Sequence, residues 1–251
     1  MELFTYQTVL IAIIIVGFAA FIHGALGIGF PMVSTPLLAL VTDVQTAILM
    51  TLLPNIAINL ISINHGGNWQ AVLKIYWLLP AAMVLGTVGG TVILITYNPD
   101  FLRILLAAAL LFYVFNSLST KKMRWNFIKA KPRLSMLGFG FFGGALGGTV
   151  NVSGPVLLVY LLESGLTTVA LIQILNICFL IGKVIQTATF ASFGMIGLEL
   201  IYISAPLLIV AVFITKAGIK VRDKFSDDIY RKLLHGLLIV VAMLLFWQFV
   251  S

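Results

Sequence analysis

Long apolar runs, separated by short clusters of glycine, proline and polar residues, cover most of this chain. The runs fall at residues 8–23, 31–41, 45–63, 71–96, 101–118, 134–147, 155–163, 167–191, 198–216 and 230–250. Several approach the length of about 20 residues that a helix needs to cross the hydrocarbon core of a bilayer. A membrane barrel would instead need strands of about ten residues with alternating polarity. The pattern predicts an all-α integral membrane protein.

The composition supports this prediction and removes several classes of function. Of the 251 residues, 61% are hydrophobic and 9% are charged, whereas about 25% are charged in an average soluble domain. A soluble enzyme, a nucleic-acid binder and a disordered tail are therefore excluded. At about 20 residues a span, seven to nine crossings fit the length. The single cysteine, Cys178, excludes an intrachain disulfide and a cysteine metal cluster.

Two of the apolar runs are each broken by glycines and followed by a serine and a proline. The first break holds Gly24, Gly27, Gly29 and Pro31, and the second holds Gly143, Gly144, Gly147, Gly148, Asn151 and Gly154. Because serine caps helices and proline fits a first turn, Ser34/Pro36 and Ser153/Pro155 are predicted to start two short helices. Helix N-termini that point towards the bilayer centre from opposite sides would suit an anion.

Matching motifs recur in the same order in the two halves of the chain. The matched segments are 24–27 with 144–147, 34–38 with 153–157, 53–56 with 174–177, Pro80 with Pro206, and 100–103 with 228–231. Five ordered matches indicate a duplication. The predicted domains are an N-terminal transmembrane repeat (1–118), a basic cytoplasmic linker (119–133) and a C-terminal transmembrane repeat (134–251).

The positions of the basic residues predict how the two repeats lie in the membrane. If each broken run turns back as a re-entrant hairpin, 13 basic residues share one side and only Arg103 lies opposite, with Lys183 inside a span. If each broken run crosses once, the split is seven to seven. Basic residues collect on the cytoplasmic side, which favours the hairpins. Each repeat is then a re-entrant helical hairpin plus three transmembrane helices, so the repeats are inverted and both termini lie outside.

The candidate substrate-binding residues are glycines and polar residues in and near the broken runs. They are Gly27, Gly29, Ser34, Asn55, Gly147, Asn151, Ser153, Gln173 and Asn176. Asn55 and Asn176 occupy matched positions, where an amide either bonds across helices or lines a pocket. His23 and Lys183 are ionisable groups within apolar runs and are candidates for proton or anion coupling. Packing of His23 and snorkelling of Lys183 to the interface are the alternatives.

The segments around the first break resemble the TauE/SafE family, the sulfite exporter and toluene-sulfonate uptake permeases. The resemblance rests on residues 17–31, which read Gly-Phe-Ala-Ala-Phe-Ile-His-Gly-Ala-Leu-Gly-Ile-Gly-Phe-Pro, on residues 34–38, and on a second copy at 138–158. It implies transport of a small sulfur-containing oxyanion of the sulfite, organosulfonate or thiosulfate class. Family members include exporters and importers, so the resemblance leaves the direction of transport open.

Together these features predict a secondary transporter of the cytoplasmic (inner) membrane that is proton-coupled and works by alternating access. A passive anion channel is the alternative. The expected partners are a small anion and the lipid bilayer. The sequence holds no zinc-protease, nucleophile-elbow or nucleotide-binding motif. We therefore expect no enzymatic activity, cofactor, metal, nucleotide or nucleic acid. The oligomeric state is not readable from the sequence.

Overall fold

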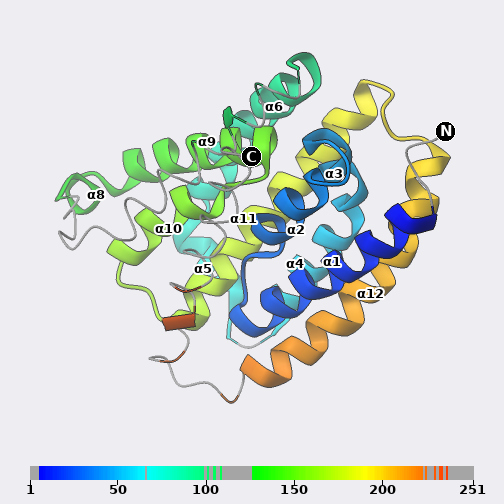
Figure 1. The fold of residues 1–251 in the computed structure, drawn as a ribbon. Coiled ribbons are helices and arrows are strands. Elements are labelled where there is room, and N and C mark those ends of the chain that lie inside the picture. Colours follow the sequence, from blue (N-terminus) through cyan, green and yellow to red (C-terminus); the bar gives the residue numbers. More distant parts are fainter. Residues whose placement is uncertain are drawn as a thin grey trace.

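The computed structural model describes residues 6–98 apart from 66, residues 126–222, and the single residues 101, 104, 105, 108, 224, 229, 232, 233 and 236. Every regular element in these residues is an α-helix, as predicted (Figure 1). The helices are α1 (Tyr6–Leu26), α2 (Phe30–Ala39), α3 (Val44–Met50), α4 (Leu52–Asn64), α5 (Trp69–Tyr76), α6 (Leu78–Thr96), α8 (Asn126–Ala130), α9 (Pro132–Val150), α10 (Gly154–Glu163), α11 (Thr168–Ser192) and α12 (Leu198–Arg222).

Four of these helices are long and apolar enough to cross a membrane. They are α1, α6, α11 and α12, and the bent pair of α3 and α4 would make a fifth span. Most of the predicted spans 101–118 and 230–250, and the first part of the linker 119–133, lie outside the described residues. The expected seven to nine crossings therefore stay a prediction, while the fold is that of a multi-pass membrane protein.

Prolines divide two runs that the hydropathy pattern treats as continuous. The run 45–63 is split into α3 and α4, which meet at 53°. Pro54 has no N–H to bond the carbonyl oxygen of Met50, and this oxygen accepts a 3.1 Å hydrogen bond from Ser204 of α12 instead. The run 71–96 is likewise split between α5 and α6, where Pro80 removes the bond to Tyr76.

The chain reverses at the two glycine-rich breaks. Residues 27–29 separate α1 from α2, and Gly27 and Gly29 have φ of 72° and 112°. Residues 151–153 separate α9 from α10, and here Asn151 takes the left-handed conformation with φ of 64°. Glycine adopts this conformation freely, and asparagine is among the few other residues that visit it. The arms are unequal in both reversals, because α2 and α10 have only ten residues each.

The predicted start of the first short helix is wrong, whereas that of the second is right. α2 begins at Phe30 with Pro31 in its first turn, so Pro36 lies inside the helix. Ser34 is therefore no cap, and its hydroxyl donates a 2.8 Å hydrogen bond to the carbonyl of Phe30. Ser153 does precede α10, although its side chain makes no capping hydrogen bond. Pro31, not Pro36, thus corresponds in the fold to Pro155.

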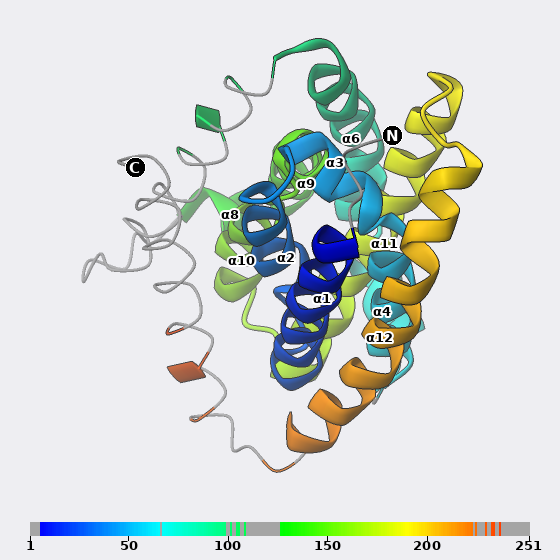
Figure 2. The same ribbon diagram turned by 45° about the vertical axis from the view of Figure 1, so that its right-hand side comes forward.

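The first helix of each predicted repeat packs against a long helix of the other, as Figure 2 shows for α1 with α12 and for α6 with α9. In the first pair, Gly17 lies near Val210 and Gly24 meets Gly218, so α1 and α12 run in the same direction. A Cβ on Gly24 would collide with the backbone of Thr215 and Gly218. Small residues let two helix backbones approach closely in a membrane.

The pair α6 and α9 repeats this close parallel packing. A Cβ at any of five glycines would collide with the backbone of the facing helix, namely Gly86, Gly90, Gly140, Gly144 and Gly148. Gly140 faces Leu79, Gly144 faces Met83 and Gly148 faces Thr87, so residue numbers rise together along both helices. The glycines in these runs therefore have a packing role as well as forming breaks.

Helices α4 and α11 lie between these two pairs and contact each other (Figure 1). Gln173, near the start of α11, donates a 3.4 Å hydrogen bond to the carbonyl of Ile63, near the end of α4, so the two helices run in opposite directions. The breaks are joined across the predicted repeats as well. Asn151 donates a 2.7 Å hydrogen bond to the hydroxyl of Thr35, and Met32 lies next to Gly154.

Candidate functional site

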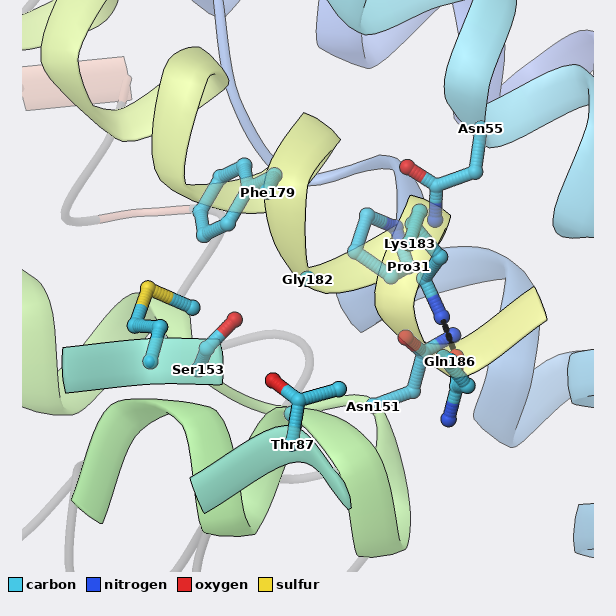
Figure 3. A pocket seen from close by; sticks show the side chains of 11 residues that line it. Pro31, Asn55, Thr87, Asn151, Ser153, Phe179, Gly182, Lys183 and Gln186 are labelled. Carbon is cyan, nitrogen blue, oxygen red and sulfur yellow. Dashed lines mark hydrogen bonds between the residues drawn. The ribbon is translucent and has the colours of Figure 1, made fainter. Parts of the chain in front are cut away.

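A cavity lies between α4, α6, α11 and the break that joins α9 to α10 (Figure 3). Its lining residues are Pro31, Asn55, Met83, Thr87, Gly147, Asn151, Ser153, Phe179, Gly182, Lys183 and Gln186. About 290 Å³ is free of atoms, but the centre of a water molecule has only about 20 Å³ in which to move. That is room for about one water molecule, so a larger ligand requires the walls to move apart.

Lys183 supplies a positive charge in this cavity. It lies in the middle of α11, is 5% exposed, and donates a hydrogen bond to Oε1 of Gln186 one turn later. Gln186 in turn donates from Nε2 to the carbonyl of Gly148 at 2.8 Å, which fixes the orientation of its amide. No carboxylate lines the cavity among the described residues. A buried cation without an anionic partner is costly, so this environment favours a bound anion.

Asn55 directs an unpartnered donor at the cavity from α4. Nδ2 of Asn59 donates both to the backbone oxygen and to Oδ1 of Asn55, at 2.8 and 2.7 Å. Because the backbone oxygen can only accept, the Asn59 atom that faces it must be the amino group. Asn55 must then turn its oxygen to Asn59, which leaves its own Nδ2 buried and without a partner. Figure 3 shows this nitrogen on the side of the Asn55 amide nearer Lys183.

Thr87 and Ser153 add hydroxyl groups from two further elements. The Thr87 side chain lines the cavity from α6, is 1% exposed, and its Oγ1 has no hydrogen-bond partner. Ser153 stands at the N-terminus of α10, where the first backbone N–H groups of a helix are free to bind an anion. Buried polar groups without partners cost about 1–3 kcal/mol each. A ligand that accepts hydrogen bonds would remove this cost.

The cavity brings together five of the predicted site residues, namely Asn55, Gly147, Asn151, Ser153 and Lys183. Six others lie outside it, namely His23, Gly27, Gly29, Ser34, Gln173 and Asn176. The side chain of Asn176 instead bonds the carbonyl oxygens of Gly27 and Ile172, at 2.7 and 2.8 Å.

Sequence reasoning did not single out Thr87 and Gln186. Gln186 follows Lys183 by three residues, a spacing that places two side chains on one face of a helix. This spacing could have identified Gln186 as a neighbour of Lys183. Thr87 lies in the segment Gly86-Thr87-Val88-Gly89-Gly90 within an apolar helix. The glycines there mark close packing, whereas nothing in the pattern says that Thr87 lacks a partner.

His23 occupies a separate polar site outside this cavity. It is fully buried in α1, and its Nε2 lies 3.0 Å from the hydroxyl of Ser62 on α4. Its Nδ1 has no hydrogen-bond partner. Ser62 follows Asn55 by seven residues, just as Lys183 follows Asn176 by seven. At these matched positions α11 therefore carries the basic Lys183, whereas α4 carries Ser62, which pairs with His23.

Spanning-length helices, paired reversals and a buried cationic cavity define a multi-pass membrane protein with a candidate anion site. The sulfite exporter TauE/SafE family model matches residues 12–245, and the chain belongs to this family. It is therefore a membrane transporter of a family associated with small sulfur-containing anions, as the sequence motifs predicted. No curated protein and no solved structure matches the chain significantly.

Proposed function

We propose that the protein is a secondary transporter that carries a small sulfur-containing oxyanion, of the sulfite, organosulfonate or thiosulfate class, across the cytoplasmic membrane. The observation that carries the proposal is the buried Lys183 with the unpartnered donors of Asn55 and Thr87 around one cavity. An oxyanion has several acceptor oxygens and a negative charge, so it complements this set. Membership of a sulfite exporter family supports the chemical class of the substrate.

In this proposal each polar group of the cavity has a distinct part in binding. The Lys183 ammonium neutralises the charge, and the donors of Asn55 and Thr87 bind the oxygens. Charge-assisted hydrogen bonds of this kind are about twice as strong as neutral ones. Gln186 holds Lys183 in place through its own bond to Gly148. The N-terminus of α10, with Ser153, adds a favourable dipole on the same side.

Alternating access between two inverted repeats is the mechanism we propose. Three relationships support it. α1 and α12 run in parallel, as do α6 and α9, while α4 and α11 run in opposite directions. When α1 is paired with α9, α4 with α11 and α6 with α12 as counterparts, α4 and α11 are antiparallel, and the parallel α1–α12 contact has the parallel α9–α6 contact as its counterpart. Inverted repeats with broken helices around a central site are a recurring plan of secondary transporters.

The orientation and domain boundaries belong to the same proposal. We place both termini outside and the basic linker inside, with repeats at 1–118 and 134–251. Single cysteines at positions 126 and 223, read with a membrane-impermeant thiol reagent, test this arrangement. Both positions should react from the cytoplasmic side only, and Cys178 adds little background because it is buried. Labelling from opposite sides would contradict the inverted arrangement.

Proton coupling through His23 completes the proposed mechanism. His23 lies outside the cavity, so it would act through the α1–α4 contact that joins it to Ser62. Replacing His23 with glutamine should leave the exchange of substrate intact. The accumulation of substrate that a pH gradient drives should be abolished.

Transport assays in proteoliposomes test the proposal against a passive channel. A transporter shows saturable flux of sulfite, thiosulfate or a small organosulfonate, and accumulates it when a pH gradient is imposed. A channel gives flux that does not saturate and never exceeds electrochemical equilibrium for the anion. Absence of flux for all three anions would refute the substrate class. Flux without saturation or pH-driven accumulation would favour the channel.

A further inference from the structure

A second, larger hollow lies between the ends of α4 and α12, away from the cavity described above. This groove is lined by Leu60, Ile61, Asn64, His65, Lys216, Ile219 and Lys220. Its volume is about 590 Å³. None of these residues lines the cavity, so the groove is a separate feature of the molecule.

The charges of the groove lie at the depth of a membrane interface. Between Glu199 and Lys216, α12 carries no charged residue, and this stretch is about 25 Å long at 1.5 Å per residue. That length is close to the hydrocarbon thickness of a bilayer, about 30 Å. Lys216 and Lys220 are one turn apart, and both are exposed. Their side of the protein is the one that the distribution of basic residues assigns to the cytoplasm.

The other wall of the groove, on α4, combines the apolar Leu60 and Ile61 with the polar Asn64 and His65. Leu60 is 45% exposed, and Ile61 follows it on α4. Of the four long apolar helices, α12 buries the smallest share of its residues within the described part of the chain. The groove therefore offers positive charge at the headgroup level and apolar side chains towards the acyl chains, which is the amphiphilic pattern of a phospholipid.

We propose that this groove is a binding site for an acidic phospholipid of the cytoplasmic leaflet. The phosphate of the headgroup pairs with Lys216 and Lys220, and an acyl chain lies along Leu60 and Ile61. Charge complementarity selects an acidic lipid over a zwitterionic one, because each basic residue near an anionic membrane surface contributes about 1 kcal/mol. By bridging α4 and α12, the lipid would join a helix of one predicted repeat to a helix of the other.

Lipid binding to the full chain in nanodiscs tests this site. The lipids are phosphatidylcholine alone or phosphatidylcholine with phosphatidylglycerol, and bound lipid is counted by native mass spectrometry alongside the unfolding temperature. The double variant Lys216→Gln/Lys220→Gln should weaken binding of phosphatidylglycerol by about 25-fold, which corresponds to the contribution of two lysines. Its unfolding temperature in phosphatidylcholine alone should match that of the unaltered protein.

Three comparisons make the test specific to the groove. Lys74→Gln/Lys131→Gln removes the same charge from exposed positions elsewhere and should keep phosphatidylglycerol binding, as should Lys216→Arg/Lys220→Arg. Free glycerol phosphate should not stabilise the protein. Equal loss in both glutamine variants, equal retention of both lipids, or stabilisation by free glycerol phosphate would overturn the proposal. A dimer that dissociates in Lys216→Gln/Lys220→Gln would overturn it too, since a second copy would then fill the groove.

Discussion

Asn176 donates a 2.7 Å hydrogen bond from Nδ2 to the carbonyl oxygen of Gly27 and so ties α11 to the break between α1 and α2. Its counterpart in the other predicted repeat, Asn55, has no partner for the same atom. The two amides occupy matched positions in the sequence but have different surroundings. One of them holds a reversal of the chain in place, and the other keeps a buried donor without a protein partner.

Alanine substitutions should separate these two roles. Asn176→Ala should lower the unfolding temperature of the ligand-free protein by about 2–4 °C, because one buried hydrogen bond contributes about 1 kcal/mol. Asn55→Ala should change the ligand-free unfolding temperature less, because Asn59 keeps its bond to the backbone oxygen of residue 55. Thermal unfolding with and without sulfite measures both effects. Only Asn55→Ala should reduce the stabilisation by sulfite, and the reverse pattern would contradict the assignment.

Removing the buried charge should separate binding from folding. In Lys183→Met the cation is replaced by an apolar side chain of similar length, so the desolvation cost of a buried unpaired charge disappears. We expect an unfolding temperature equal to or above that of the unaltered protein, together with loss of stabilisation by sulfite. A drop of several degrees without ligand would show that Lys183 is structural.

A carboxylate beside Lys183 should neutralise the cavity. In Gln186→Glu the new side chain can accept the same hydrogen bond from Lys183, but it can no longer donate to Gly148. The net charge around the cavity falls by one, so affinity for a small oxyanion should fall by about tenfold or more, as charged hydrogen bonds are worth about 1.5–3 kcal/mol. Isothermal titration with sulfite measures this. Gln173→Glu, on the same helix but outside the cavity, is the matched control and should bind as before.

The close contact of α1 with α12 should tolerate no side chain. A Cβ on Gly218 would lie 2.5 Å from the carbonyl oxygen of Phe21 and 3.0 Å from the Cα of Gly24. Gly218→Ala must push the two backbones apart, and overpacking of this kind costs about 1–3 kcal/mol. The unfolding temperature should fall accordingly. Gly138→Ala and Gly197→Ala introduce a Cβ into open space and should be neutral; equal losses in all three variants would contradict the packing.

The sequence pattern predicted the helical class, the two reversals and five residues of the cavity, because these depend on local chemistry. Glycine at positive φ and proline in a first turn are local properties. The pattern placed the first short helix about one turn too late, because Ser34/Pro36 and Gly29/Pro31 are both plausible starts. Only the fold shows that Pro31 takes the first turn.

The remaining features of the site depend on contacts between distant segments. Whether Asn55 or Asn176 has a free donor is decided by Asn59 and by Gly27, and neither contact is written in a hydropathy pattern. The same holds for Thr87, which lines the cavity because α6 lies in parallel against α9. Sequence reasoning could therefore locate the breaks and some of the side chains near them, but not the full set of side chains that lines the cavity.

The most direct test of the account is sulfite counterflow in proteoliposomes preloaded with unlabelled sulfite, comparing the unaltered protein with Lys183→Gln. Counterflow reports exchange at the binding site and needs no knowledge of the coupling ion. We predict rapid exchange of labelled sulfite in the unaltered protein and in the exposed-lysine control Lys74→Gln, and loss of at least about tenfold in Lys183→Gln. Undiminished exchange in Lys183→Gln would contradict the assignment of this cavity as the anion site.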